Sequence, residues 1–195
     1  MQHPNRTLLA EVSFEELVPF LRPQLRPTRV WGLIYWAVNL APVGWLTFVA
    51  WHEKISIDIF LTKAGQGVWL FLVLLPLHEL IHAGAYKMIG APKVSFGANL
   101  KKFYFYAVAD QFMTSRKSFL FVALSPYLLI TAGLVTAAAL SSPPTRLLFL
   151  GAIILHTAGC FGDFALVSFM HQHRHQNIVT MDDLTEKKAY FFMVN

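Results

Sequence analysis

Five consecutive residues, His78-Glu79-Leu80-Ile81-His82, form the pattern H-E-x-x-H. Residues four positions apart lie on the same face of an α-helix, so His78 and His82 could bind one Zn²⁺ ion together. The carboxylate of Glu79 would then be placed to act as general base toward a zinc-activated water. The pattern therefore predicts a zinc site with two histidine ligands and one catalytic glutamate.

The segments around this pattern are unusually apolar. The chain of 195 residues is 55% hydrophobic and only 14% charged, which is typical of an integral membrane protein. Four segments are long enough to cross a bilayer, and they are residues 30–51, 67–90, 119–140 and 146–170. They are apolar nearly all round, which disfavours the alternative of buried helices in a soluble bundle. A charged residue at membrane depth costs about 2.5–3.5 kcal/mol, so Glu79 within the second segment calls for a function.

The predicted fold class is therefore an all-α integral membrane protein with four transmembrane helices in a single membrane domain, residues 1–195. Thirteen of the sixteen Lys and Arg residues fall on one side: in the two tails, in the loop between the second and third helices, or, for Lys87, at the end of the second helix that leads into this loop. The other side has only Lys54, Lys63 and Arg146. This asymmetry predicts a cell (inner) membrane protein with both termini in the cytoplasm. It also accounts for the net charge of +5 without nucleic acid as a partner.

Apart from the two connections 52–66 and 141–145, three segments lie outside the predicted spans. Residues 1–29 form an N-terminal tail, in which Ser13-x-x-Glu16 predicts the start of a short interfacial helix; a mobile tail is the alternative. Residues 91–118 alternate as in a β-hairpin around a turn at Gly97-Ala98-Asn99. This hairpin could offer an edge strand to a peptide substrate, or serve only as a structural lid. Residues 171–195 form the C-terminal tail.

A catalytic zinc usually has a third protein ligand. Depth in the membrane favours Asp163, which lies roughly 17 residues below the outer end of its span, whereas His82 lies roughly 15 below its own. The alternative is a carboxylate that pairs with a buried histidine or hydroxyl group. The other candidates downstream are Asp110, His156, Cys160, His171, His173 and His175.

His156 lies on the same helix face as Asp163, two turns outward. Four roles remain open for it: an alternative ligand, a residue that holds a ligand in place, a proton relay, or an ordinary interior histidine. Cys160 lies off that face. Ser125 and Pro126, in the third span, fall at the same depth as Asp163 and are predicted to line the cleft around the site.

These residues resemble intramembrane zinc metalloproteases of the site-2 protease type, and more narrowly the small four-span bacterial zincin peptidases. The motifs that carry the resemblance are His78–His82, Leu124-Ser125-Pro126 and Gly162-Asp163. The resemblance implies that His78, His82 and Asp163 hold Zn²⁺, that Glu79 is the general base, and that the active site lies near the cytoplasm. It also implies a membrane-associated hairpin after the catalytic helix. Residues 158–164 lack the Asn-Pro and the Gly after the aspartate that site-2 proteases usually show.

The function predicted from the sequence is a membrane-embedded zinc-dependent peptidase that hydrolyses peptide bonds of membrane proteins or membrane-associated peptides. The main alternative is a non-catalytic membrane metal-binding or scaffold protein derived from such a protease. A prenyl-protein type of protease would use a downstream glutamate ligand, and the first glutamate after the motif is Glu186, in the tail. A structural membrane protein with a fortuitous motif is the last alternative.

Overall fold

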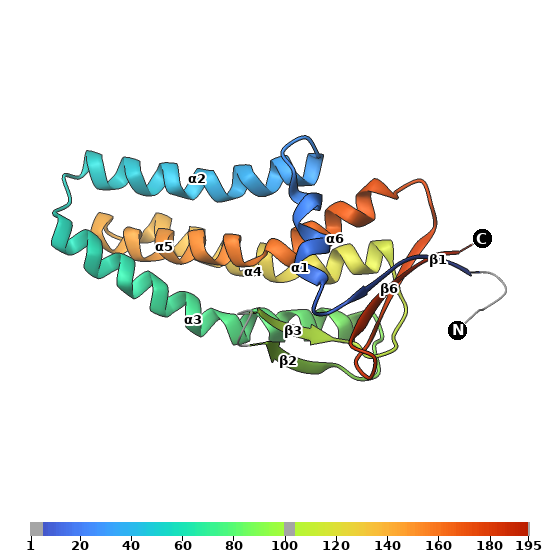
Figure 1. The fold of residues 1–195 in the computed structure, drawn as a ribbon. Helices are drawn as coiled ribbons and strands as arrows, with labels where there is room; N and C mark the ends of the chain where they lie inside the picture. Colours follow the sequence, from blue (N-terminus) through green and yellow to red (C-terminus); the bar gives the residue numbers. More distant parts are fainter. Residues whose placement is uncertain (1–5, 100–103, 195) are drawn as a thin grey trace.

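Five helices dominate the computed structural model, which describes residues 6–99 and 104–194 (Figure 1). Three of them are long: α2 (Val30–His52), α3 (Ile57–Met88) and α4 (Arg116–Leu140). Two shorter helices follow in the chain, α5 (Pro143–Gly159) and α6 (Phe161–Gln172). Helices α2, α4 and α5 run alongside one another, and α3 crosses beneath them at an angle (Figure 1).

The described residues also form two β-sheets. Strand β2 (Ser95–Asn99) pairs with β3 (Tyr104–Val108) as an antiparallel hairpin beside the C-terminal half of α3. A second, four-stranded sheet has the order β1-β6-β5-β4 and joins the two ends of the chain at one end of the molecule. Its strands are β1 (Arg6–Ser13), β4 (Thr114–Ser115), β5 (Ile178–Asp183) and β6 (Lys188–Val194).

Three of the described helices are long and apolar enough to cross a membrane. Helix α2 agrees with the prediction for residues 30–51, and α4 contains the predicted segment 119–140. Helix α3 begins at Ile57, well before the predicted residue 67. The fourth predicted span, residues 146–170, is a broken helix in which α5 and α6 are bent by 45° around Cys160. Counting this pair as one span gives four.

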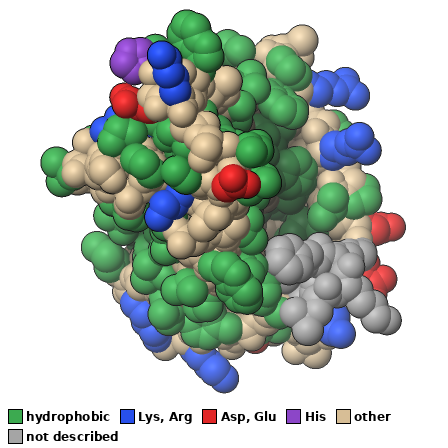
Figure 2. Space-filling view, turned by 90° about the vertical axis from the view of Figure 1, so that its left-hand side faces the viewer, with side chains coloured by type: hydrophobic (Ala, Val, Ile, Leu, Met, Phe, Trp, Pro, Cys, Tyr) green, Lys and Arg blue, Asp and Glu red, His purple; other side chains and the backbone are tan. Residues whose placement is uncertain are grey.

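The outer surfaces of these helices are apolar. The side chains of Trp51, Trp69 and Leu140 are 79%, 72% and 84% exposed, although each would normally be buried in a water-soluble protein. Outer helix surfaces of this kind fit contact with lipid tails. The end of the bundle seen in Figure 2 is mixed, because hydrophobic side chains lie there beside several Lys and Arg and a few Asp and Glu side chains.

The all-helical prediction was incomplete because it missed the four-stranded sheet. Both predicted tails contribute to it, since β1 pairs with β6 and β6 pairs with β5. The predicted hairpin is present, but the predicted turn at Gly97-Ala98-Asn99 is wrong, because these residues belong to β2. Gly97 is needed there for space: a Cβ atom on it would lie 2.2 Å from the ring of Tyr106, its partner across the hairpin.

The short helix predicted after Ser13 is α1 (Leu17–Leu21), and a 3₁₀ turn, η1 (Arg22–Leu25), follows it. The hydroxyl of Ser13 accepts a hydrogen bond from the backbone N–H of Glu16 at 3.2 Å, which is half of the predicted capping box. Leu21 and Leu25 are buried in a cluster that also contains Phe164 of α6. Helix α1 therefore packs against the helical bundle, which argues against a mobile tail.

A close contact between α3 and α5 sets the framework for the site. At Gly67 of α3, a Cβ atom would lie 2.7 Å from the backbone oxygen of Leu148 in α5. Only glycine allows the two backbones to approach so closely. Helix α3 ends at Met88, and Gly90, two residues later, has a φ of 94° that suits glycine and turns the chain toward the hairpin.

Candidate metal centre

The two histidines of the H-E-x-x-H pattern lie on one face of α3, as their spacing predicts. Their Nε2 atoms are 3.1 Å apart, and their ring centroids are separated by 4.7 Å. His82 is buried and His78 is partly buried, so both rings point into the protein and away from the lipid-facing surface. The helix alone thus supplies two of the donor atoms.

Asp163, in the first turn of α6, supplies the third donor group. Its Oδ2 atom is 3.4 Å from Nε2 of His78, and its Oδ1 atom is 3.4 Å from Nε2 of His82. The bend at Cys160 redirects α6, and Asp163 lies three residues beyond it. The residue favoured by depth as the third ligand therefore lies directly beside the two histidines.

Hydrogen bonding defines which nitrogen of His82 is free. Its Nδ1 atom lies 3.0 Å from the backbone oxygen of Val122 in α4. A carbonyl oxygen can only accept, so Nδ1 carries the hydrogen and the Nε2 lone pair faces His78 and Asp163. Metal-binding histidines are commonly oriented by such a bond on the other ring nitrogen.

The spacing of the donors fits zinc. Tetrahedral ligands at 2.0–2.1 Å from a zinc ion are about 3.3 Å from one another. The two histidine nitrogens are 3.1 Å apart, and each lies 3.4 Å from one of the two carboxylate oxygens of Asp163. The donor atoms of His78, His82 and Asp163 all lie within 4.8 Å of one another. Lone pairs and a carboxylate that converge in this way repel one another unless a cation lies between them. The residues present therefore suit Zn²⁺.

Glu79 lies beside this group of donors and is left with unused hydrogen-bonding capacity. Among the described residues, its Oε2 atom is buried without a hydrogen-bond partner. The backbone amide of Ala107 in β3 also interacts with the Glu79 carboxylate. A buried polar atom without a partner is costly, and active sites are where such atoms are found. Glu79 is thus available to bind a proton or a water molecule.

These four residues share one cavity of about 400 Å³. Its walls come from α3, α4 and the α5–α6 bend, and also from α1, the hairpin and the four-stranded sheet. Most of the lining is apolar, with the polar groups gathered at the metal site. Apolar walls with a few convergent polar groups are typical of binding sites for small molecules or peptide segments. The lining residues from α1 and the sheet include Leu17, Val18, Leu21, Ala189 and Phe191.

A second, shallower groove of about 510 Å³ runs between α3 and the hairpin. It shares Leu75, Glu79, Phe105 and Tyr106 with the cavity, so both reach the carboxylate of Glu79. Its lining is almost entirely apolar, and it lies beside residues of α3, such as Leu80, that are exposed on the outer surface. The site can thus be approached from the side of the bundle.

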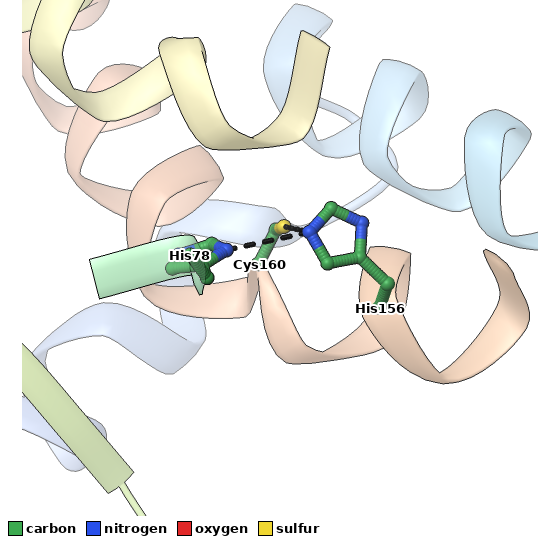
Figure 3. A group of neighbouring side chains, drawn as sticks. All are labelled: His78, His156 and Cys160. Carbon is green, nitrogen blue, oxygen red and sulfur yellow. Dashed lines mark hydrogen bonds between the residues drawn. The ribbon is translucent and has the colours of Figure 1, made fainter. Parts of the chain in front are cut away.

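His156 and Cys160 lie behind His78, as Figure 3 shows. Nε2 of His156 is 3.3 Å from Nδ1 of His78 and 3.9 Å from Sγ of Cys160. His156 therefore contacts the nitrogen of His78 that faces away from Asp163. Cys160 was expected to lie off this face, but it follows His156 by four residues, one helical turn, and its side chain contacts the His156 ring.

Several predicted site residues lie elsewhere. Ser125 and Pro126 are not among the described residues that line the cavity, so that prediction was wrong. The hydroxyl of Ser125 donates to the backbone oxygen of Phe121, while Val122 and Ala123 form the α4 wall. Val122 lies three and four residues before Ser125 and Pro126 and therefore on the same side of α4, so the lining of the cavity ends about one helical turn before them.

The remaining ligand candidates are also remote. Asp110 accepts a hydrogen bond from the backbone N–H of Leu184 at 2.9 Å and supports the β5–β6 turn. Within the described chain, His171, His173 and His175 are not part of any group of donors close enough to share a metal. His173 instead contacts the backbone oxygen of Phe169.

One polar residue of the cavity was missed by the sequence argument. Asp182 of β5 lines the cavity together with Thr180, two residues earlier on the same strand. Burial and, to a smaller extent, the nearby carboxylate of Asp110 raise the pKa of Asp182 to about 7. Because the C-terminal tail was not expected to form a strand, no sequence signal placed Asp182 at the site.

Comparison with known proteins agrees with this geometry. The model of a family described as "putative zincin peptidase" matches residues 71–178, a stretch that includes His78, Glu79, His82, His156 and Asp163. No match was found among curated proteins or solved structures. The match covers more than half of the chain. It includes the part of α3 with the H-E-x-x-H pattern, the hairpin and the bent helix that carries Asp163. The protein therefore belongs to this zincin peptidase family.

Proposed function

We propose that this protein is a membrane-embedded zinc-dependent peptidase that hydrolyses peptide bonds of membrane proteins or membrane-associated peptides. In this proposal His78, His82 and Asp163 hold the zinc and Glu79 is the general base. The observation that carries it is the convergence of the three donor groups, 3.1–3.4 Å apart, beside the partnerless Oε2 atom of Glu79. A site built only for metal storage would need the ligands but not this carboxylate.

The chemistry follows from the positions of these groups. A zinc ion held here would act as a Lewis acid, which acidifies water and polarises the carbonyl group of the scissile bond. Glu79 takes a proton from the attacking water and returns it to the leaving amine nitrogen. The apolar walls of the cavity exclude bulk water, which strengthens the electrostatic interactions around the carboxylate.

The apolar groove between α3 and the hairpin suggests how a substrate enters. An extended segment of a membrane protein could lie in this groove, which leads to Glu79. The hairpin has only two strands, so a peptide could also pair with one of its edges. A transmembrane helix must unwind locally first, because its carbonyl groups are otherwise engaged in helical hydrogen bonds.

The arrangement also favours the finer parts of the proposal. The third ligand lies on the last apolar segment, as in proteases of the site-2 type, and the broken helix α5–α6 serves as the fourth span. The sheet that joins the termini forms one wall of the cavity. In this proposal the helices lie in the inner membrane and both termini are in the cytoplasm. The active site then lies near the cytoplasmic surface, where water is available.

A pair of variants tests the proposal. Membranes from cells that express the wild type, Glu79→Gln or His82→Ala would be compared by mass spectrometry of newly formed protein termini. The zinc content of each purified protein would be measured in detergent. We expect one zinc per chain for the wild type and Glu79→Gln, and new termini only with the wild type; loss of the base typically lowers rates 10²–10⁴-fold. His82→Ala should lose both zinc and cleavage.

Two results would overturn the proposal. New termini that persist with Glu79→Gln would show that the glutamate is not the base, and a full zinc complement in His82→Ala would show that the metal lies elsewhere. If zinc binds but neither the wild type nor Glu79→Gln gives termini that are absent from cells without the protein, the protein is a metal-binding scaffold. The unfolding temperature of each variant serves as the control for folding.

A further inference from the structure

We propose that His156 is a positioning residue, which fixes the orientation and the tautomer of the ligand His78. It does so by accepting a hydrogen bond from Nδ1 of His78 and by donating one to Thr131. This inference rests on the zinc site proposed above and adds a function for a residue that binds neither zinc nor substrate.

The contacts of His156 are those of a support behind a ligand. Its Nε2 atom is 3.3 Å from Nδ1 of His78, and its Nδ1 atom is 3.3 Å from Oγ1 of Thr131 in α4. Its side chain is only 2% exposed, so water does not replace these partners. The rings of His78 and His156 lie at 67° to each other, with centroids 5.5 Å apart (Figure 3).

The direction of each hydrogen bond follows from the site. Nε2 of His78 faces Asp163 and His82 and must offer its lone pair to a metal, so the hydrogen of the neutral ring is on Nδ1. His156 must then accept at Nε2, which places its own hydrogen on Nδ1. That hydrogen points to Oγ1 of Thr131, which can accept it. All three groups are satisfied in only one arrangement of hydrogens.

The two ligand histidines are therefore oriented by different partners. His82 donates to the backbone oxygen of Val122, which any residue could provide. His78 relies on a side chain, and its partner lies on the broken helix that also carries Asp163. Asp163 follows His156 by seven positions, about two helical turns, with the bend at Cys160 between them. One bent element thus supplies both a ligand for the metal and the support for another ligand.

A second cation between His78, His156 and Cys160 is the rival explanation, because their donor atoms also lie within 4.8 Å of one another. It would require His78 to bind metals through both ring nitrogens, and so to lose both ring hydrogens, which neutral histidine does not do readily. The 3.9 Å contact between Sγ of Cys160 and Nε2 of His156 is also longer than the roughly 3.6 Å expected for a sulfur and a nitrogen that share a tetrahedral zinc ion.

The test compares zinc affinities, measured by competition with a chelator, for purified wild type and four variants. In His156→Leu the ring is replaced by an apolar group of similar size, and we expect zinc to bind about 10–100-fold more weakly. His156→Gln restores an accepting oxygen and should recover most of this loss. Thr131→Val should weaken zinc only a few-fold. Cys160→Ser is the matched control, with the affinity of the wild type.

Cobalt(II) in place of zinc gives a second readout, because its visible absorption spectrum reports the geometry of the ligands. We expect an altered spectrum for His156→Leu and a spectrum close to that of the wild type for His156→Gln. The inference is overturned if His156→Leu binds zinc like the wild type, or if His156→Gln is no better than His156→Leu. Two metal ions per chain, one of them lost in both His156→Leu and Cys160→Ser, would overturn it in favour of the second cation.

The comparison holds even if one variant folds poorly. Thr131→Val leaves the histidine in place and tests the same chain of hydrogen bonds from its other end; an affinity equal to that of the wild type would contradict the donated bond. Because affinity is measured without a substrate, the inference can fail while cleavage stands. If cleavage fails while these affinities behave as expected, the peptidase is wrong but the metal site and its support are right.

Discussion

At the scale of single residues, the site shows how an apolar interior can hold several polar groups in place. The far nitrogen of His82 is held by the backbone oxygen of Val122, and the far nitrogen of His78 by His156. Both rings are therefore oriented before a metal arrives, which lowers the entropic cost of binding. Glu79 differs, because its Oε2 atom has no partner among the described residues. The ligands are fixed, whereas the base remains free to act.

Asp182 gives a prediction about pH. Burial and the Asp110 carboxylate raise its pKa to about 7 in the folded protein, compared with about 3.9 in an unfolded chain. Between these values the folded state binds the extra proton, so stability should fall as the pH rises from about 4 to 7. Each unit of difference corresponds to about 1.4 kcal/mol. We expect Asp182→Asn to be more stable than the wild type at pH 8, with a flatter pH profile.

Thermal unfolding in detergent at several pH values between 5 and 8 would measure this difference. Glu53→Gln, an exposed carboxylate at the opposite end of the molecule, is the control and should follow the wild type. Equal slopes for Asp182→Asn and the wild type would show that Asp182 does not hold its proton in the fold. The metal site contributes equally to both proteins, so it cancels in the comparison.

The sequence predicted the residues of the metal site better than their surroundings. The spacing of His78 and His82 follows from helical geometry, and the depth argument found Asp163 on a distant segment. The sequence left four roles open for His156, because a ring that lies two turns from Asp163 could face several neighbours. The failure with Ser125 and Pro126 has a different cause, since counting residues from the end of a span places a residue along its helix only to within about one turn, and the cavity is lined one turn earlier, by Val122 and Ala123.

At the scale of elements, the bend between α5 and α6 is the feature on which the site depends. Cys160 joins the two helices, which meet at 45°. His156 precedes the bend and Asp163 follows it, and both reach His78 on α3. In a straight helix these two residues would lie about two turns apart along one face. The bend between them allows both side chains to reach the ring of His78.

The packing of α3 against α5 should be sensitive to Gly67. A methyl group there would lie 2.7 Å from the backbone oxygen of Leu148, so Gly67→Ala must push the helices apart. Overpacking of this kind typically costs about 1–3 kcal/mol. Gly65 lies on the same helix and has no atom within 4 Å of its Cβ position. Gly65→Ala should therefore be neutral or slightly stabilising, since alanine favours helices.

Thermal unfolding and zinc affinity of both variants would check this expectation. If the two helices separate, the contact between His78 and His156 should weaken as well, and Gly67→Ala should bind zinc less tightly than Gly65→Ala. Equal unfolding temperatures for the two variants would mean that the contact at Gly67 is not as close as the structure places it.

The elements themselves were predictable to different degrees. Long apolar runs identify α2, α3 and α4 because a helix forms its backbone hydrogen bonds within one continuous segment. The strands of the four-stranded sheet were missed, because β1 pairs with β6 from the opposite end of the chain and has no strong pattern of its own. Strand formation depends on such partners more than on local sequence. The hairpin was found because both of its strands are neighbours in the sequence.

At the scale of the whole molecule, the two ends of the chain pair with each other in one sheet. Strands β1 and β6 bring the termini together, and the sheet they form lies at one end of the helices (Figure 1). Thr180, Ala189 and Phe191 on the inner face of this sheet line the cavity. The tails are therefore part of the cavity wall, and we expect deletion of either to open the cavity to water.

The position of the termini at one end of the helices leads to a prediction about membrane topology. The side of the molecule with the termini also has most of the basic residues, whereas Lys54, Lys63 and Arg146 lie at the other end of the helices. Basic segments are retained in the cytoplasm. We therefore expect position 186, in the β5–β6 turn, to be cytoplasmic and position 53, in the α2–α3 connection, to be on the outside.

Single cysteines can report both sides, because the natural Cys160 is fully buried and can be replaced by serine. In intact cells, a maleimide that cannot cross membranes should label Glu53→Cys but not Glu186→Cys, while both should react after detergent is added. Both side chains are exposed, so access depends on the membrane and not on the fold. Labelling of Glu186→Cys in intact cells would reverse the orientation and place the active site near the outer surface. Equal labelling of both positions before detergent would instead mean that the apolar helices do not cross a membrane.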